Sequence, residues 1–181
     1  GGAPVDAVAA YTYALTGSAQ VADDRTLGRL SSTKGDGLNG GSGTVTCTLS
    51  GAGVTPWIIN SPGGGTPSSF TPNSGTVNYT GTGTINLAPV TFYNLGLRNI
   101  LDGSGAATTF TLPGNTTVNN VLTVGNSGSL NSTTLDGSSF ILTLAGSGTP
   151  FVLAGSSKGL FTASTSTVNY IGSSATNVTS A

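Results

Sequence analysis

The sequence predicts an all-β fold, in the form of a β-solenoid (parallel β-helix-like) with an atypical N-terminal cap segment. Composition, strand patterning and an internal repeat support this prediction. Only 6% of the 181 residues are charged, against roughly 25% in typical soluble domains. The chain has 29 glycines and is rich in Thr, Ser and Asn, whereas Glu and Met are absent. Abundant β-branched residues and turn formers favour short strands joined by tight turns.

An internal repeat favours the solenoid over other all-β folds. The segment Phe70–Gly81 returns as Phe161–Gly172, with an offset of 91 residues and seven of twelve positions identical. Stacked repeats bury one another and make elongated surfaces. A coil of roughly 20–30 residues would fit three or four times into this offset. The alternative is a β-sandwich, pilin-like domain completed by strand exchange, with the repeat reflecting duplicated hairpins.

Short apolar runs from Phe70 onward indicate the strands of the β-repeat region. Many alternate apolar and polar residues with period two, so one face of each strand is expected to be buried. Stacked coils lie about 4.8 Å apart, which suits ladders of Asn and Thr and stacks of aromatic rings. Turn signals containing Asp-Gly separate the strands at 101–104 and 135–138. The predicted strands are 76–79, 84–87, 90–95, 109–112, 121–124, 140–144 and 151–153.

The N-terminal third differs in amino-acid composition from the rest. We divide the chain into an N-terminal cap or assembly segment, 1–62, and a β-repeat region, 68–181, separated by a Pro- and Gly-rich break. The apolar run Ala7–Leu15 predicts a strand or a short helix. Most of the charge follows between residues 23 and 36, which fits either a polar terminal cap or a solvated turn region.

The remaining composition limits partners and cofactors. A net charge of −1 gives no electrostatic footprint for nucleic acid, and no apolar run is long enough to span a membrane. The single cysteine, Cys47, lies in a strand-like pattern and is expected to be a small buried residue, with an intermolecular disulfide as the alternative.

Two segments of the β-repeat region resemble known repeats. The run Gly75–Gly83 followed by Thr91–Leu95, and the run Gly114–Val124, look like paired repeat units of large secreted bacterial surface proteins. These repeats are similar to the β-solenoid stalks of adhesins and filamentous-haemagglutinin-like exoproteins. The resemblance covers about residues 68–181. It implies an extracellular or cell-surface location and a structural or adhesive role, with no catalytic residues and no cofactor.

The chain termini suggest how subunits could assemble. Thr12–Leu15 shares a Tyr-x-Leu spacing with Phe92–Leu95, and by the repeat offset Ala181 corresponds to Val90. We therefore predict that the N-terminal segment of one subunit extends the sheet at the C-terminal segment of the previous one. This contact would give a head-to-tail homopolymer through strand addition. The predicted assembly residues are Tyr11, Tyr13, Leu15 and Val178.

Residues for catalysis or metal binding are scarce. The chain has no His, which excludes His-based triads and His metal sites. Asp23, Asp24 and Asp36 are the clustered carboxylates that could support glycoside cleavage or hold Ca²⁺. Adjacent residues on a strand point to opposite faces, so a turn or cap role is favoured for them. We expect no enzyme activity, no cofactor and no metal site.

Three further patterns bear on surface chemistry. Asn78, Asn115, Asn131 and Asn177 lie in sequons that could accept N-glycans on an exported protein. Thr-x-Thr pairs at 44/46, 82/84 and 165/167 suggest ice binding as a function. Their irregular spacing in the sequence argues against the regular threonine array that this function needs. The aromatic residues Tyr79, Phe92, Tyr93 and Tyr170 could form a sugar-stacking strip, although a solenoid favours placing them in or against the core.

The sequence thus favours an extracellular structural protein, a subunit or segment of a self-assembling filament, stalk or surface layer with an adhesive role. Its expected partner is a second copy of itself, followed by glycans or other cell-surface material. The alternative is a glycan-binding adhesin or phage-fibre segment, and a carbohydrate-active enzyme ranks below both.

Overall fold

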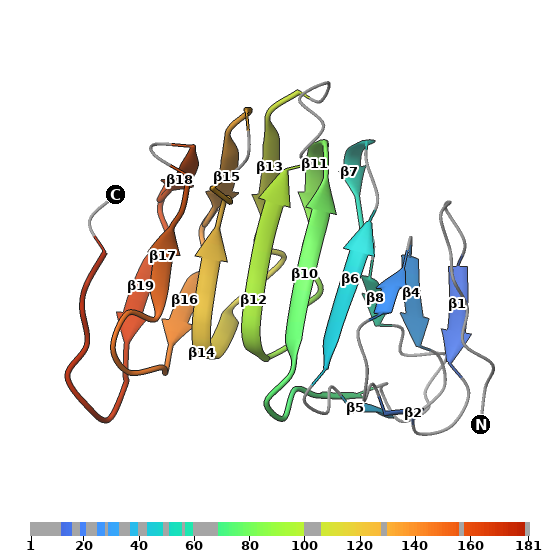
Figure 1. The fold of residues 1–181 in the computed structure, drawn as a ribbon, viewed down its shortest axis with the longest axis horizontal. Helices are drawn as coiled ribbons and strands as arrows, with labels where there is room; N and C mark the ends of the chain where they lie inside the picture. Colours follow the sequence, from blue (N-terminus) through green and yellow to red (C-terminus); the bar gives the residue numbers. More distant parts are fainter. Residues whose placement is uncertain are drawn as a thin grey trace.

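The chain forms a β-solenoid, seen from the side in Figure 1. The computed structural model describes residues 12–15, 19–20, 25–27, 29–32, 37–39, 43–48, 51–55, 57–59, 69–99, 106–127, 130–155 and 158–179. Within these residues the regular elements are strands, and every pairing between them is parallel. Parallel pairing requires each strand to return by a crossover, which a coiled chain supplies. The predicted all-β solenoid is confirmed.

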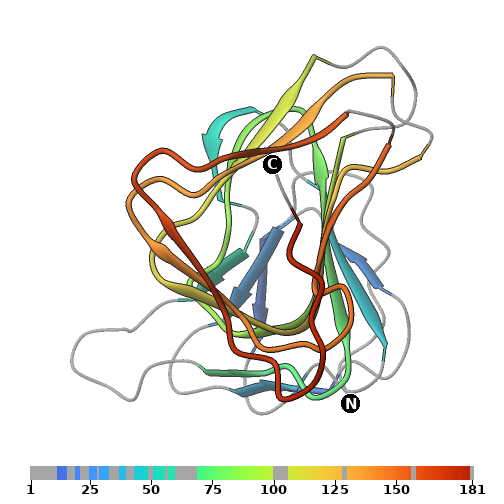
Figure 2. The same ribbon diagram turned by 90° about the vertical axis from the view of Figure 1, so that its left-hand side faces the viewer.

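Each coil contributes strands to three sides, which gives the outline in Figure 2. The first side contains β6 (Thr44–Thr48), β10 (Thr76–Gly81), β12 (Phe92–Asn99) and β17 (Phe151–Leu153). The second side contains β7 (Gly51–Val54), β11 (Gly83–Asn86), β13 (Thr108–Thr111), β15 (Thr133–Asp136) and β18 (Gly159–Thr162). The third side contains β16 (Ile141–Leu144) and β19 (Thr167–Tyr170).

The strand β14 (Thr116–Val124) joins the third side to the first. Thr116 pairs with Leu142 of β16, whereas Leu122 pairs with Phe151 of β17. One strand therefore belongs to two sides. The side chains of Thr116, Val118, Leu122 and Val124 are buried, whereas Asn120, between the two halves of the strand, is half-buried.

The N-terminal strands continue the stack. β1 (Thr12–Leu15), β4 (Arg29–Ser32) and β8 (Trp57–Ile59) form one small sheet, and β2 (Ala19–Gln20), β5 (Gly37–Asn39) and β9 (Ser69–Thr71) form another. β3 (Arg25–Leu27) pairs with β6, which in turn pairs with β10. Strand pairing thus crosses the predicted boundary between 1–62 and 68–181. Of the apolar run 7–15, the described part, 12–15, is a strand.

The core is built from columns of side chains that stack from coil to coil. On the first side, register places Val45, Val77, Leu95, Leu122 and Phe151 above one another. All five side chains are at most 2% exposed. Full burial of one such side chain contributes about 1.5–3 kcal/mol to the free energy of folding. The columns are therefore a major source of stability. A second column, on the second side, is formed by Ile85, Phe110, Leu135 and Phe161.

Tyr79 and Cys47 lie side by side in this core. The Tyr79 ring is fully buried and makes edge-to-face contacts with Phe92 and Phe110, each at a centroid distance of 6.4 Å. Its hydroxyl accepts a hydrogen bond of 3.1 Å from the backbone N–H of Ala88. Burial raises the pKa of the Cys47 thiol to about 12 and also raises that of Tyr79. The predicted burial of Cys47 is confirmed.

The predicted role of the aromatic residues in the core is also confirmed for three of them. Tyr79 and Phe92 are fully buried, and Tyr170 packs against the core. Tyr93 is half-buried. A continuous outer strip of these four rings is therefore not formed, because period-two alternation turns Phe92 inward and leaves Tyr93 outside.

The 91-residue repeat is not the period of the coil. Val77 belongs to a column that reaches Phe151 in steps of 18, 27 and 29 residues. Its repeat counterpart, Val168, instead pairs with Leu142 on the third side. The repeated segment is a turn followed by a strand, and in this chain it occupies two different sides of the coil. The two repeat copies therefore lie in different columns of the stack.

What the two copies share is local geometry. Asn73 and its counterpart Ser164 both have positive φ angles, of 45° and 52°. Each lies in a tight turn closed by a backbone hydrogen bond, from Gly75 N–H to the Pro72 carbonyl and from Ser166 N–H to the Ala163 carbonyl. The repeated sequence thus specifies a turn conformation.

Candidate assembly surface

The coil nearest the C-terminus leaves its core partly uncovered. β18 pairs with β15, and β19 pairs with β16; each ends its sheet in the described part of the chain. The inward side chains of Phe161 and Val168 are half-buried, whereas their neighbours one coil earlier, Leu135 and Leu142, are fully buried. The difference arises because no described coil lies beyond the last one.

Among the described strands, β19 pairs along one edge only, with β16. Thr167 donates its N–H to the Phe140 carbonyl at 3.1 Å, and Ile171 donates its N–H to the Leu144 carbonyl at 2.9 Å. Because backbone groups alternate direction along a strand, the N–H and C=O groups of Val168 and Tyr170 face the open edge. Lys158 is the single charged residue between 158 and 179. This edge therefore lacks the charged residues that usually prevent edge-to-edge pairing.

The segment after β19 adds exposed apolar side chains to this end. It runs along the first side. There the Gly148 N–H donates a hydrogen bond to the Ala175 carbonyl, and the Thr179 hydroxyl donates one to the Phe151 carbonyl. Ile171 is 60% exposed and Val178 is 70% exposed. We name β18, β19 and residues 171–179 together the open end.

The predicted assembly residues fall at both ends of the stack. Val178 lies at the open end. Tyr13 and Leu15 are in β1, where they pair with Leu30 and Ser32, and Tyr11 lies outside the described residues. Figure 1 shows β1 and β19 at opposite extremes of the solenoid. This placement is the one that a head-to-tail contact requires.

The four predicted glycosylation residues differ in accessibility. Asn115 and Asn177 are exposed: Asn115 Oδ1 accepts from the Ile141 N–H at 2.9 Å, and Asn177 Nδ2 donates to the Thr149 hydroxyl at 3.0 Å. Asn131 is half-buried. The Asn78 side chain is 8% exposed. Asn78 is therefore a poor glycan acceptor in the folded protein, because its amide lies against the neighbouring coil at Gly96.

The predicted Asn and Thr ladder is present on the first side. Asn120 Nδ2 donates to Asn94 Oδ1 at 2.8 Å, and Asn94 Nδ2 donates to the Thr76 hydroxyl at 3.2 Å. These two bonds connect three successive coils through side chains alone. Each contributes about 0.5–1.5 kcal/mol and fixes the register of the stack.

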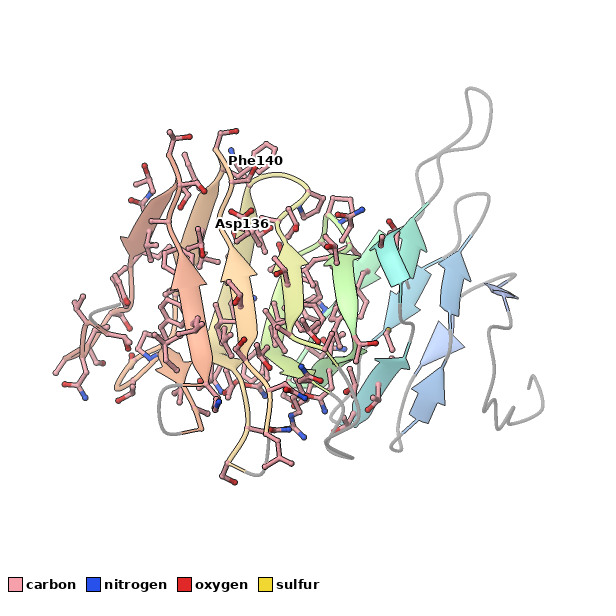
Figure 3. The ribbon with its side chains drawn as sticks, turned by 90° about the horizontal axis from the view of Figure 1, so that it is seen from above. Asp136 and Phe140 are labelled. Atoms are coloured by element: carbon pink, nitrogen blue, oxygen red, sulfur yellow. The ribbon has the colours of Figure 1, made fainter. Side chains whose placement is uncertain are left out.

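Little in the described residues suggests metal or acid–base chemistry. Asp23, Asp24 and Asp36 lie outside them. In the described part of the chain no group of three metal-ligating side chains is present, and no helix is long and apolar enough to cross a membrane. Asp136 is labelled in Figure 3. Its Oδ1 accepts hydrogen bonds from the Ser138 N–H at 2.8 Å and from the Ser164 hydroxyl at 3.3 Å. Its described contacts thus join turns on neighbouring coils.

Comparison with protein-family models, curated proteins and solved structures found no match. The β-solenoid fold implied by the resemblance to adhesin repeats is present. A family relationship to those adhesins stays a prediction. Sequence analysis missed Phe161 and Val168 as surface residues. Their alternating pattern is that of ordinary core positions, and their partial exposure follows from their place in the last described coil.

Proposed function

We propose that this chain is a structural segment of an extracellular filament, stalk or surface layer, in which solenoids associate end to end. The observation that carries the proposal is the open end. In the described part of the chain, it combines a parallel strand edge without a partner strand, partly exposed core side chains and an almost complete lack of charge.

A second copy is the occupant that best fits this surface. The interfaces of β13 with β15 and of β15 with β18 each join parallel strands in register over a stacked apolar core. A further coil of the same geometry would bury Phe161, Val168 and Tyr170 and satisfy the backbone groups on the edge of β19. Such a heterologous contact propagates as a fibre and does not close into a dimer.

The extracellular location and the adhesive role are supported by the resemblance of residues 68–181 to secreted repeats. A glycan-binding adhesin or phage-fibre segment is the alternative. The burial of Tyr79 and Phe92 weakens it, because these rings are not available for stacking on a sugar.

A pair of charge substitutions tests end-to-end association. Ile171→Lys places a charge at the open end, and Leu130→Lys places one at a similarly exposed residue, 69% exposed, on a loop before β15. Sedimentation velocity and negative-stain electron microscopy would compare both variants with the unmodified chain. We expect the unmodified chain and Leu130→Lys to form long fibres and Ile171→Lys to stay monomeric.

Two results would contradict the proposal. The first is a monodisperse unmodified chain at all concentrations, which would shift the weight to the glycan-binding alternative. The second is equal association of the two variants, which would show that the contact lies elsewhere. Deleting residues 1–15 then tests the N-terminal half of the contact: fibres that survive the deletion would exclude β1 as the complementary strand.

A further inference from the structure

The outer face of the second side carries two columns of small polar side chains. Register places Thr84, Thr109 and Thr134 in one column, and Asn86, Thr111, Asp136 and Thr162 in the next. We call these seven residues the hydroxyl face. Figure 3 looks down on the parallel strands of this side, with Asp136 at the end of β15. At the last strand, β18, the first column ends in Leu160.

The five threonine hydroxyls of this face have no hydrogen-bond partner among the described residues. In the described part of the chain, none of them makes a hydrogen bond to another protein group. The inward threonines of the same strands behave differently: the Thr108 hydroxyl donates to the Gly81 carbonyl at 2.7 Å, and that of Thr133 accepts from the Asn99 N–H at 3.1 Å. The outward hydroxyls therefore need hydrogen-bond partners from outside the protein.

The spacing of these hydroxyls is set by the backbone. Neighbouring coils place equivalent residues about 4.8 Å apart, and alternate residues of one strand lie about 6.6 Å apart. Each threonine carries a methyl group beside its hydroxyl, so the face offers donors, acceptors and apolar groups at these spacings. The interatomic repeats of crystalline water have similar dimensions.

We propose that the hydroxyl face binds ice. Electrostatics fits an uncharged lattice, because Asp136 is the single charged residue on the face and its Oδ1 already accepts two protein hydrogen bonds. The face also lacks aromatic side chains, the usual platforms for sugar rings. The aromatic residues of these strands, Phe110 and Phe161, point inward.

The irregular Thr-x-Thr spacing in the sequence does not oppose this inference. Thr109 and Thr134 become neighbours through lateral pairing of β13 and β15, although they lie 25 residues apart in the chain. Steps of 25 residues also separate Thr84 from Thr109. The alignment of these three threonines is therefore a property of the stacked strands.

Two lysine variants of equal charge test the proposal. Thr109→Lys disrupts the centre of the hydroxyl face, and Thr143→Lys makes the same change at a half-buried outward residue of β16, on the third side. The purified chain and both variants would be compared for thermal hysteresis, for the shape of ice crystals and for partitioning into growing ice. Circular dichroism melting would confirm that all three are folded.

We expect the unmodified chain and Thr143→Lys to shape ice crystals and to show concentration-dependent hysteresis, and Thr109→Lys to lose both. Round crystals and no hysteresis for the unmodified chain would overturn the inference, as would equal activity of the two variants. The outcome is independent of end-to-end association, since the hydroxyl face lies on the side of the solenoid and a monomer carries it whole.

Discussion

Replacing Tyr79 with Phe removes one oxygen atom from the centre of the core and leaves the ring in place. The ring is fully buried between Phe92 and Phe110, and its packing is unchanged by the substitution. What is lost is the acceptor for the Ala88 N–H, which lies 3.1 Å from the hydroxyl oxygen. Ala88 is itself fully buried, so water cannot replace the lost partner.

The expected cost is the desolvation penalty of a buried, unpaired backbone donor, about 1–3 kcal/mol. This is a large share of a typical folding free energy of about 5–15 kcal/mol. With a urea m-value of about 1–3 kcal/mol/M, the unfolding midpoint should fall by on the order of 1 M. The direction follows from geometry, because the Ala88 N–H makes no other hydrogen bond within the described residues.

Urea unfolding followed by circular dichroism measures this effect, with Tyr93→Phe as the matched control. Tyr93 is half-buried, and its hydroxyl makes no hydrogen bond within the described part of the chain. We expect that control to stay within about 0.5 kcal/mol of the unmodified protein. Equal stability of the two variants would refute the reasoning, since it would mean that the Ala88 N–H finds another partner or that the bond contributes nothing.

Two further predictions concern the thiol and the close packing of coils. The raised pKa of Cys47 means that burial favours its neutral form, so the associated stability is complete below about pH 9 and is lost as pH rises toward about 12. Cys47→Ala should therefore remove a decline of about 1.4 kcal/mol per pH unit in this range, measured as the pH dependence of urea unfolding; parallel pH profiles would count against it. Gly146→Ala would place a Cβ 1.9 Å from the Asn120 carbonyl oxygen, whereas a Cβ at Gly114 meets nothing within 4 Å. Thermal melting should show a loss of about 1–3 kcal/mol for Gly146→Ala and almost none for Gly114→Ala, and a tolerated Gly146→Ala would show that the coils can separate without cost.

Some features of the solenoid could be predicted because they are local. Alternation of apolar and polar residues over two to five positions decides which side of a strand faces inward, and Phe110 and Leu135 follow this rule. Turn conformation is also local, as the shared positive φ of Asn73 and Ser164 shows. The burial of Cys47 and Tyr79 and the Asn ladder follow from the same rules once a stacked fold is assumed.

Register could not be predicted, because it depends on lateral pairing between residues 17 to 32 positions apart. The coils vary in length, so no fixed offset identifies neighbours. The 91-residue repeat does not identify the columns, nor the close approach of two coils at Gly96, where a Cβ would lie 2.1 Å from Asn78 Oδ1. The hydroxyl face could not be predicted from the sequence for the same reason, because its columns depend on the register between coils.

The sequence by itself determined the composition of the strands, their inward residues, the turns and the low charge that leaves edges unprotected. The tertiary structure alone decided which side each strand occupies, which threonines align and where the core lies open. The physical reason is the range of the interactions involved. Side-chain alternation and turn geometry act between residues adjacent in the chain, whereas stacking acts between coils and depends on the length of every loop that joins them.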